Sequence, residues 1–191
     1  MIIKTVVVGP LETNCYIAAS VQGGKAMVID PGEDVGKIIS ALEEDRLQLT
    51  YIVTTHAHFD HIQAAKELKQ AKGGAIYGHP ADSLPFADKE LADGMKFDLD
   101  GLEFKIMHTP GHSAGSCSVL TEGAIFSGDL LFEGAVGRTD FPGGSVDQLL
   151  DSLDKLRLLP EETIVYPGHG PSTRLGREIK VNPFFQVRGR G

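Results

Sequence analysis

The sequence predicts a domain of the α/β class in which two packed β-sheets are covered by helices. Short apolar runs separated by glycine-rich turns indicate strands in both halves of the chain. Each half ends in segments whose apolar residues recur at helical spacing, and such halves suit two sheets with helices outside. With 191 residues, 41% hydrophobic and 23% charged, the chain has the size and composition of one globular domain, expected to span residues 1–191.

The first half is predicted to contain strands joined by tight turns and followed by helices. The strands are expected at residues 2–8, 14–19, 26–29 and 51–55, with a turn at residues 22–25. A helix is predicted at residues 33–47, because four apolar residues there have helical spacing: Val35, Ile38, Ile39 and Leu42. A second helix at residues 62–72 is expected to stop at Gly73-Gly74.

The second half is predicted to begin with two hairpins. Strands at residues 96–99 and 102–107 flank an Asp-Gly turn, and strands at residues 116–121 and 124–127 flank a Glu-Gly turn. An amphipathic helix at residues 145–158 has five apolar residues on its predicted buried face: Val146, Leu149, Leu150, Leu153 and Leu156. A strand at residues 163–165 and a last helix at about residues 175–181 complete the domain.

Three of the seven histidines and an aspartate lie in one hexapeptide, His56-Ala57-His58-Phe59-Asp60-His61. Borderline divalent metals such as Zn²⁺ or Fe²⁺ accept imidazole and carboxylate ligands. In extended backbone, residues 56, 58 and 60 share one side and His61 takes the other. One ion can take His56 and His58, while Asp60 and His61, displaced along the chain, suit a second. This concentration favours a two-metal site over a surface loop with incidental histidines.

Further metal-ligating residue types follow three other predicted strands. His112 lies in the turn 109–113, Asp129 follows the strand that includes residues 124–126, and His169 lies in the turn 166–170. In each case an apolar run stops and a His or Asp appears in a glycine-rich turn. Ligands at the ends of several strands, gathered at one rim of a sheet, form a typical enzyme site.

These motifs resemble the metallo-β-lactamase superfamily, specifically its glyoxalase II-like (hydroxyacylglutathione hydrolase-like) branch, from the N-terminus to about Asn182. The resemblance implies a four-layer αββα sandwich. It also implies two divalent ions, with zinc expected and iron or manganese as alternatives. The implied ligands are His56, His58 and His112 for the first ion, Asp60, His61 and His169 for the second, and Asp129 as a bridge. Asp60 and Asp129 are the implied catalytic residues.

The resulting hypothesis is a metal-dependent thioesterase. Two ions about 3.5–4 Å apart can share a water and lower its pKa towards about 7, which gives a hydroxide that attacks a polarised carbonyl. The expected substrate is S-2-hydroxyacyl (lactoyl) glutathione or a related small-thiol thioester, whose thiolate leaves without a separate general acid. Full-length glyoxalase II enzymes carry a C-terminal helical domain for glutathione, which this chain is expected to lack.

A loop after Asp129 supplies a candidate substrate-binding residue. Arg138, in Gly137-Arg138-Thr139-Asp140-Phe141, has the guanidinium that suits a substrate carboxylate. An ion pair with Asp140 that ties the loop is an equal alternative. This loop also resembles that of persulfide dioxygenases, which use one Fe²⁺; the corresponding triad would be His56, His112 and Asp129.

Two other functions are weaker alternatives. Lactone hydrolysis fits the same superfamily, and a non-catalytic metal-binding domain is disfavoured by the complete ligand set. The net charge of −8 argues against nucleic-acid binding. Residues 1–8 are too short and too interrupted by Lys4 for a signal peptide or membrane span, and Cys15 and Cys117 suit a reduced core, so a cytoplasmic protein is expected. The oligomeric state is not predicted.

Overall fold

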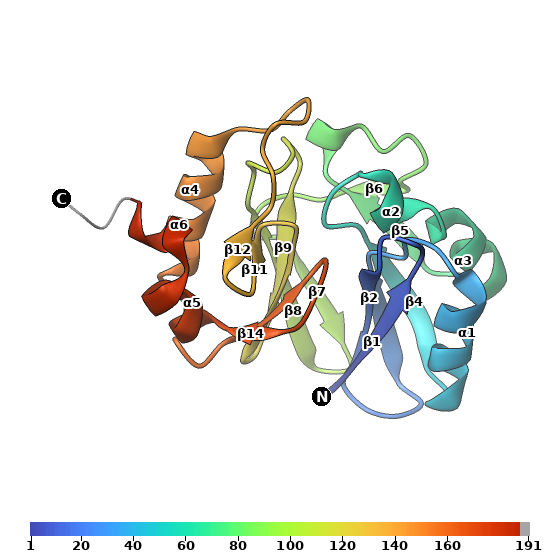
Figure 1. Ribbon diagram of the computed structural model, residues 1–191. Coiled ribbons are helices and arrows are strands. Elements are labelled where there is room, and N and C mark those ends of the chain that lie inside the picture. The colour runs from blue at the N-terminus through green and yellow to red at the C-terminus, as the bar shows by residue number, and fades with distance from the viewer. Residues whose placement is uncertain (188–191) are drawn as a thin grey trace.

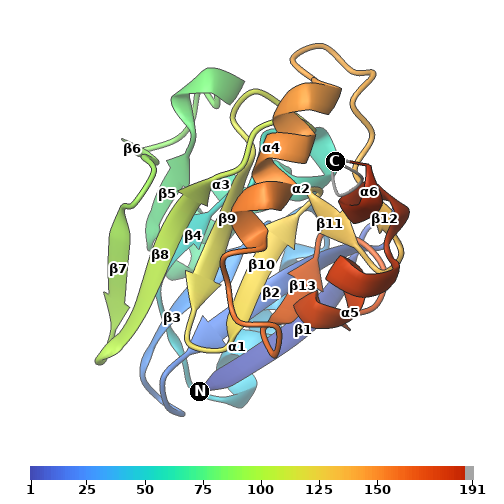
Figure 2. The same ribbon diagram turned by 90° about the vertical axis from the view of Figure 1, so that its left-hand side faces the viewer.

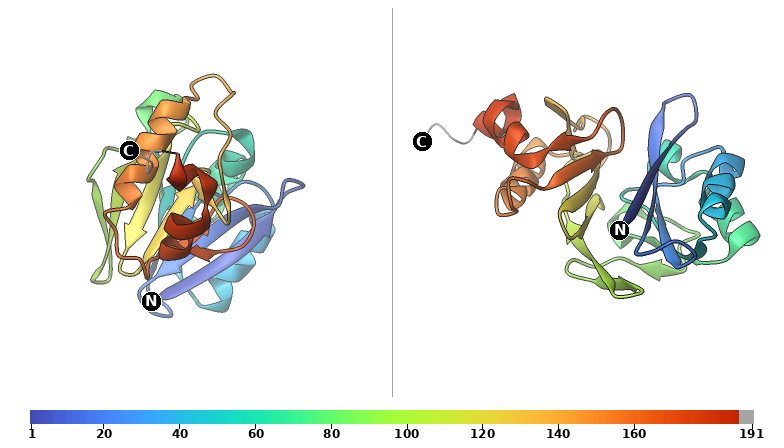
Figure 3. Two further views of the ribbon diagram at one scale, coloured as in Figure 1. Left: turned by 60° about the vertical axis from the view of Figure 1, so that its left-hand side comes forward. Right: turned by 90° about the horizontal axis from the view of Figure 1, so that it is seen from below.

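The computed structural model describes residues 1–187 and consists of two stacked β-sheets with helices on both outer faces (Figure 1). Each large sheet has six strands, in the orders β1-β2-β3-β4-β5-β6 and β14-β13-β10-β9-β8-β7. Seen from below, the two sheets lie in the middle and the helices flank them on either side (Figure 3). The predicted four-layer αββα sandwich is therefore confirmed.

The first sheet contains the N-terminal strands, and the pairing of neighbouring strands changes from antiparallel to parallel at β3. Its strands are β1 (Ile2–Val8), β2 (Thr13–Ala19), β3 (Lys25–Ile29), β4 (Gln48–Val53), β5 (Ala75–Gly78) and β6 (Lys89–Glu90). Tight turns make β1, β2 and β3 antiparallel, whereas β3 to β6 are parallel. Parallel neighbours need crossover connections, and helices α1 (Val35–Glu44) and α3 (Ala65–Lys72) supply two of them.

The second sheet is mostly antiparallel, with one parallel pair. Its strands are β7 (Lys96–Leu99), β8 (Leu102–His108), β9 (Cys117–Thr121), β10 (Ala124–Gly128), β13 (Ile164–Pro167) and β14 (Thr173–Arg174). β10 and β13 run parallel because α4 (Val146–Leu156) crosses between them over the outer face, as Figure 2 shows. A small hairpin, β11 (Leu131–Phe132) and β12 (Ala135–Val136), and helices α5 (Leu175–Val181) and α6 (Pro183–Gln186) complete this half.

Apolar cores fill the three spaces between the four layers. Strand β2 shows how one strand serves two of them: Cys15, Ile17 and Ala19 pack toward α1 and α3, while Tyr16 and Ala18 face the second sheet. A strand that is buried on both faces is apolar without alternation. The third core lies under α4, α5 and α6. Within residues 1–187, no helix is long and apolar enough to cross a membrane.

Some predicted helices differ in extent. The helix predicted at residues 62–72 is two helices, α2 (Phe59–Ile62) and α3, so the helical backbone begins within the metal motif. The helix predicted at residues 33–47 is shortened to α1. Val146 was predicted to be buried, but it is 58% exposed. Gly111 lies against the α4 backbone at Leu149, and Val146 is one turn before this contact.

Candidate metal centre

All of the predicted ligands lie at one edge of the sandwich, where segments from both sheets meet. His56 and His58 follow β4, and Asp60 and His61 are on α2, which lies in the upper part of the view in Figure 1. The other three come from the second sheet: His112 from the loop after β8, Asp129 from the end of β10 and His169 from the turn after β13. Seven side chains that are separated along the sequence are thus gathered in space.

The ligand atoms form two adjacent clusters. His56, His58 and His112 form the first cluster, and the Nε2 of His112 lies 2.8 Å from the Nδ1 of His58. The second cluster comprises Asp60, His61 and His169, where the Asp60 carboxylate is 3.4 Å from the Nε2 of His61 and 3.3 Å from that of His169. Within each cluster the ligand atoms all lie within 4.8 Å of one another.

Asp129 lies between the two clusters. Its Oδ1 is 3.5 Å from the Nε2 of His61, and its Oδ2 is 3.5 Å from the Nε2 of His112. These separations exceed ordinary N–H···O distances of about 2.7–3.2 Å. They match the ligand-to-ligand distance of about 3.3 Å that follows from tetrahedral coordination with Zn–N bonds of about 2.0–2.1 Å. The Asp129 oxygens therefore lie at the spacing of a coordination shell, with this carboxylate positioned between the two clusters.

Three buried polar atoms at this centre provide a test of the fit to metal ions. Among residues 1–187, the buried side-chain atoms without a hydrogen-bond partner are the Nε2 atoms of His56 and His61 and the Oδ1 of Asp129. Such atoms are costly to bury unless something binds them. One comes from each cluster and the third from the carboxylate between them, so the residues fit two ions.

The hydrogen bonds on the far side of two rings fix which nitrogen is free. The Nδ1 of His112 donates to the carbonyl of Arg138 (2.8 Å), and the Nδ1 of His169 donates to the carbonyl of Leu11 (3.0 Å). A carbonyl only accepts, so Nδ1 carries the hydrogen and Nε2 keeps its lone pair for a metal.

Asp30 organises histidines of both clusters, although sequence reasoning missed it. This buried carboxylate lies 3.0 Å from the Nδ1 of His61 and accepts from the amide and hydroxyl of Thr55 (2.6 and 2.7 Å). Because the Thr55 hydroxyl gives its only hydrogen to Asp30, it accepts from the Nδ1 of His56 at 3.1 Å. The available signal was a single acidic residue at the end of an apolar strand, before Pro31-Gly32.

Two further residues outside the predicted set hold the ligand-bearing segments. Asp82 accepts hydrogen bonds from the amide of Ala57 (3.1 Å), the hydroxyl of Ser113 (2.7 Å) and the amide of Gly115 (2.6 Å). It therefore joins the loop of His58 to the loop of His112. Thr13 donates to the Asp60 carboxylate at 2.9 Å. Nothing in the sequence marks either residue, since each acts through segments that are distant along the chain.

The pKa values of the histidines follow from burial and charge. Burial, reinforced by the neighbouring histidines, holds the pKa of His56 well below its usual value. Burial opposes the charge on His61 too, but Asp30 and then the other carboxylates outweigh it and raise its pKa to about 9. At neutral pH, the metal-free centre thus combines a neutral His56 with a protonated His61.

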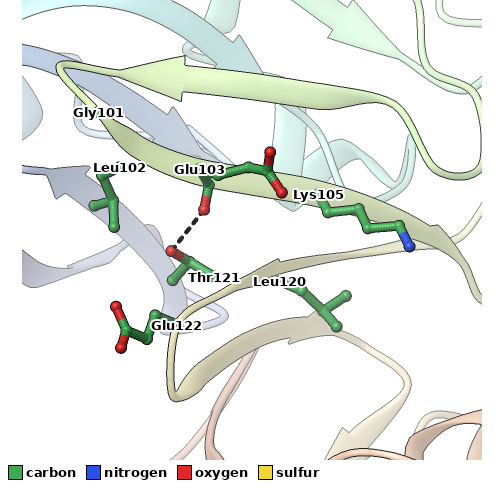
Figure 4. A pocket seen from close by; sticks show the side chains of 7 residues that line it. All are labelled: Gly101, Leu102, Glu103, Lys105, Leu120, Thr121 and Glu122. Carbon is green, nitrogen blue, oxygen red and sulfur yellow. Dashed lines mark hydrogen bonds between the residues drawn. The ribbon is translucent and has the colours of Figure 1, made fainter.

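A cavity of about 780 Å³ opens over the two clusters. Five ligands line it, namely His58, Asp60, His112, Asp129 and His169, and its walls are mainly apolar: Leu11, Phe59, Phe132, Phe141 and Pro142. Figure 4 shows a separate hollow at the start of β8 and the end of β9. Its lining includes Glu103, Lys105 and Thr121 but no histidine, and Thr121 donates to the Glu103 carbonyl. The metal-ligating side chains therefore line the first cavity and not this hollow.

Arg138 also lines the cavity, and its side chain forms an ion pair with Asp140. Its Nε and a terminal nitrogen donate to the two carboxylate oxygens at 2.7 and 2.6 Å, and the guanidinium lies 3.9 Å from the ring centroid of Phe141. This pairing lowers the pKa of Asp140 to about 2. The loop tie considered from the sequence is therefore present; binding of a substrate anion by Arg138 stays a prediction.

The fold and the site together define a class, a metal-binding α/β sandwich with its centre at the sheet edge, and comparison with known families identifies it. The family model "Metallo-beta-lactamase superfamily" matches residues 8–169. The chain belongs to this superfamily, and this membership supports a metal-dependent hydrolase.

Three similar proteins bear on the function. The hydroxyacylglutathione hydrolase GloC of Haemophilus influenzae is 35% identical, over 98% of this chain and all of its own length. The crystal structure of ETHE1 from Myxococcus xanthus has a TM-score of 0.89 and 32% identity, covering 100% of this chain and 86% of that one. TTHA1623, solved in a di-iron-bound form, has a TM-score of 0.86 and 38% identity, covering 95% and 99%.

Proposed function

We propose that this protein is a two-metal thioesterase that hydrolyses S-2-hydroxyacyl thioesters such as lactoyl-glutathione or a related small-thiol ester. The proposed ligands are those named from the sequence, with His56, His58 and His112 for one ion and Asp60, His61 and His169 for the other. The observation that carries the proposal is the Asp129 carboxylate, whose two oxygens each lie 3.5 Å from a histidine of a different cluster. That arrangement would let Asp129 contribute a ligand to each of two ions.

The chain supplies positioning and charge around the reacting carbonyl. When bound, the two ions would lower the pKa of a water and polarise the thioester carbonyl. Asp60 and Asp129 are proposed as the catalytic carboxylates because both face the space shared by the clusters. Burial works against ionisation of Asp60, but His169, His61 and Thr13 hold its pKa well below the usual value, so it stays ionised. A thiolate leaving group needs little protonation, which removes the need for a separate acid.

The likeness to GloC supports the reaction class. That protein is called a hydroxyacylglutathione hydrolase, and this chain aligns with its full length. TTHA1623, which is similar to this chain, was solved with two irons. We propose zinc as the resident metal, with iron and manganese as alternatives for the same histidine and carboxylate ligands.

A persulfide dioxygenase that uses one Fe²⁺ on His56, His112 and Asp129 is the second candidate. The structural likeness to ETHE1 over the whole chain favours it. The residues of the second cluster are present in both the hydrolase and the dioxygenase patterns, so they do not separate the two reactions. The likeness to GloC over the full length of that protein is what favours the hydrolase.

The deciding experiment compares the two reactions in the same metal-loaded protein. We expect release of one thiol and one acid per turnover from lactoyl-glutathione under strict anaerobiosis. Oxygen uptake with glutathione persulfide, together with sulfite formation and no thioester turnover, would overturn the proposal in favour of the dioxygenase. A simple lactone assayed in parallel tests the lactonase alternative.

Two variants make the result specific to the centre. Asp129→Ala should abolish thiol release and lower the metal content, because it removes a ligand between both clusters. Glu122→Ala, which changes an exposed carboxylate in the distant hollow of Figure 4, is the matched control and should behave as wild type.

A further inference from the structure

We propose that the site selects thioesters by apolar, preferably aromatic, groups flanking the reacting carbonyl, and that it does not recognise charges on the thiol carrier. This inference rests on the proposed thioesterase function and names its substrate class. It is carried by the side chains around the metal centre, which are apolar at places where solvent exposure would favour polar residues.

Exposed apolar side chains from three separate segments converge on the cavity. Leu11 comes from the turn between β1 and β2, Phe59 begins α2, and Phe141 lies in the loop between β12 and α4. They are 50%, 59% and 41% exposed, respectively. None of them is needed to fill a core, so their convergence around one cavity indicates a surface that binds an apolar ligand.

An aromatic ring stands beside each metal-ligand cluster. Phe141 contacts His58 of the first cluster edge to face, with 5.5 Å between ring centroids. Phe132 is placed against His169 of the second cluster, at 6.3 Å. A thioester carbonyl held between the clusters would therefore have an aromatic wall near each of its two substituents.

The charges in the cavity do not suit a carrier such as glutathione, which has two carboxylates. Among the residues that line the cavity, all within the described part of the chain, Arg138 is the one Lys or Arg side chain. Its guanidinium is held by both oxygens of Asp140 and covers the ring of Phe141. A cation that is already paired adds to the aromatic wall and offers little to a second carboxylate.

The test uses four thioesters, lactoyl and mandeloyl, each on glutathione and on the neutral thiol N-acetylcysteamine. We expect kcat/KM for mandeloyl, in which phenyl replaces methyl, to exceed that for lactoyl by about 10-fold or more on both carriers. Exchange of the carrier should change kcat/KM by less than about 3-fold. Two results would overturn the inference. One is a kcat/KM for lactoyl thioesters equal to that for mandeloyl thioesters, and the other is a 10-fold lower kcat/KM on the neutral carrier than on glutathione.

Variants assign the preference to the wall. Phe59→Ala and Phe141→Ala should each reduce the mandeloyl-to-lactoyl ratio several-fold, and Phe59→Leu should restore most of it. Leu158→Ala removes an 87% exposed side chain just beyond α4 and serves as the control, with an unchanged ratio. Metal content is measured for every variant. An unchanged ratio in both alanine variants with full metal content would refute the role of the wall.

The outcomes separate the two levels of the proposal. A protein with two bound ions that hydrolyses none of the four thioesters contradicts the proposed function itself. Hydrolysis without acyl preference leaves the thioesterase standing and removes only this inference.

Discussion

At the scale of single residues, the metal centre depends on one buried carboxylate that need not touch a metal. Asp30 contacts His61 directly and reaches His56 through the hydroxyl of Thr55. It thereby orients one ligand in each cluster and holds a proton on His61 in the metal-free protein. Partners of this kind orient metal-binding histidines and raise their basicity.

Metal binding should release a proton from His61. Because its pKa is raised to about 9, this ring is protonated at pH 7 and must lose its proton to bind a metal. We expect about one proton from this group per chain at pH 7, with release declining as the pH rises through about 9. Calorimetric titration of the metal-free protein in buffers of different ionisation enthalpy measures this number.

Asp30→Asn provides the contrast for this prediction. Without the carboxylate, burial should lower the pKa of His61, so its proton should already be absent at pH 7 and release should fall. Asp98→Asn, on β7 in an exposed position, is the matched control. Equal proton release from Asp30→Asn and wild type would contradict the coupling between the two residues.

Arg138 and Asp140 yield a second prediction at this scale. Binding of a substrate carboxylate by Arg138, which the sequence suggested, would require displacement of Asp140, because both oxygens of Asp140 already accept from the guanidinium. Asp140→Asn should therefore lower KM several-fold for a thioester with a carboxylate and leave a neutral thioester unchanged. Arg138→Ala in the same background should cancel this gain. Equal effects on both substrates would leave Arg138 as a loop tie alone.

At the scale of elements, close backbone approach lets the segments that carry the ligands converge. Gly168 lies just after β13. A Cβ added to it would lie 2.1 Å from the Oδ1 of Asp129 and 2.8 Å from the Cε1 of His61, so no larger residue fits there without movement. Gly137 similarly leaves room for the carbonyl of Asp129. The glycine-rich turns noted in the sequence thus allow ligands to approach each other closely.

Substitution of Gly168 should damage the centre more than the fold. Gly168→Ala forces Asp129 or the turn to move, so we expect loss of metal and at least about 100-fold loss of activity, consistent with small displacements at a catalytic site. Far-ultraviolet circular dichroism should remain native. Gly36→Ala, on α1 with nothing within 4 Å of the added Cβ, is the control and should be neutral or slightly stabilising. Full metal content in Gly168→Ala would show that the turn can adapt.

At the scale of the whole molecule, the metal centre joins the two halves of the sandwich. Four proposed ligands follow strands of the first sheet, and three follow strands of the second. Outside this edge, the halves are held together mainly by the apolar core between the sheets. Ions bound to residues of both sheets are therefore expected to stabilise the complete domain and not one half of it.

Metal removal should lower the melting temperature of the entire domain. A ligand present at 100 times its Kd stabilises the native state by about 2.7 kcal/mol. The metal-free protein should therefore unfold in a single transition at a measurably lower temperature than the metal-loaded protein. Elemental analysis should find up to two ions per chain after reconstitution. In Asp129→Ala, metal addition should raise the melting temperature much less than in the wild type. A plateau at one ion would refute the two-metal arrangement, and two separate transitions would refute the coupling of the halves.

Much of the fold followed from local patterns, and the exceptions have local or contextual causes. Strands β2 and β3 and both hairpins of the second sheet were predicted from apolar runs and turn residues, since these depend on neighbours in sequence. The short strands β5, β6, β11, β12 and β14 were not predicted, because so few residues carry little pattern of their own and are defined as strands by their pairing. Val146 fits the apolar face of α4, but it is the first residue of the helix and lies before the buried part of that face, which begins at Leu149.

The sequence by itself determined the types of ligand and the segments that carry them, because donor chemistry and strand-end position are properties of the chain. Tertiary structure alone decided that Asp129 lies between the two clusters, that Asp30 and Asp82 hold the ligand segments, and that Arg138 is paired with Asp140. Most of these contacts join residues that are distant along the chain. Their geometry is set by how two sheets pack and where glycines allow close approach, and no short stretch of sequence encodes it.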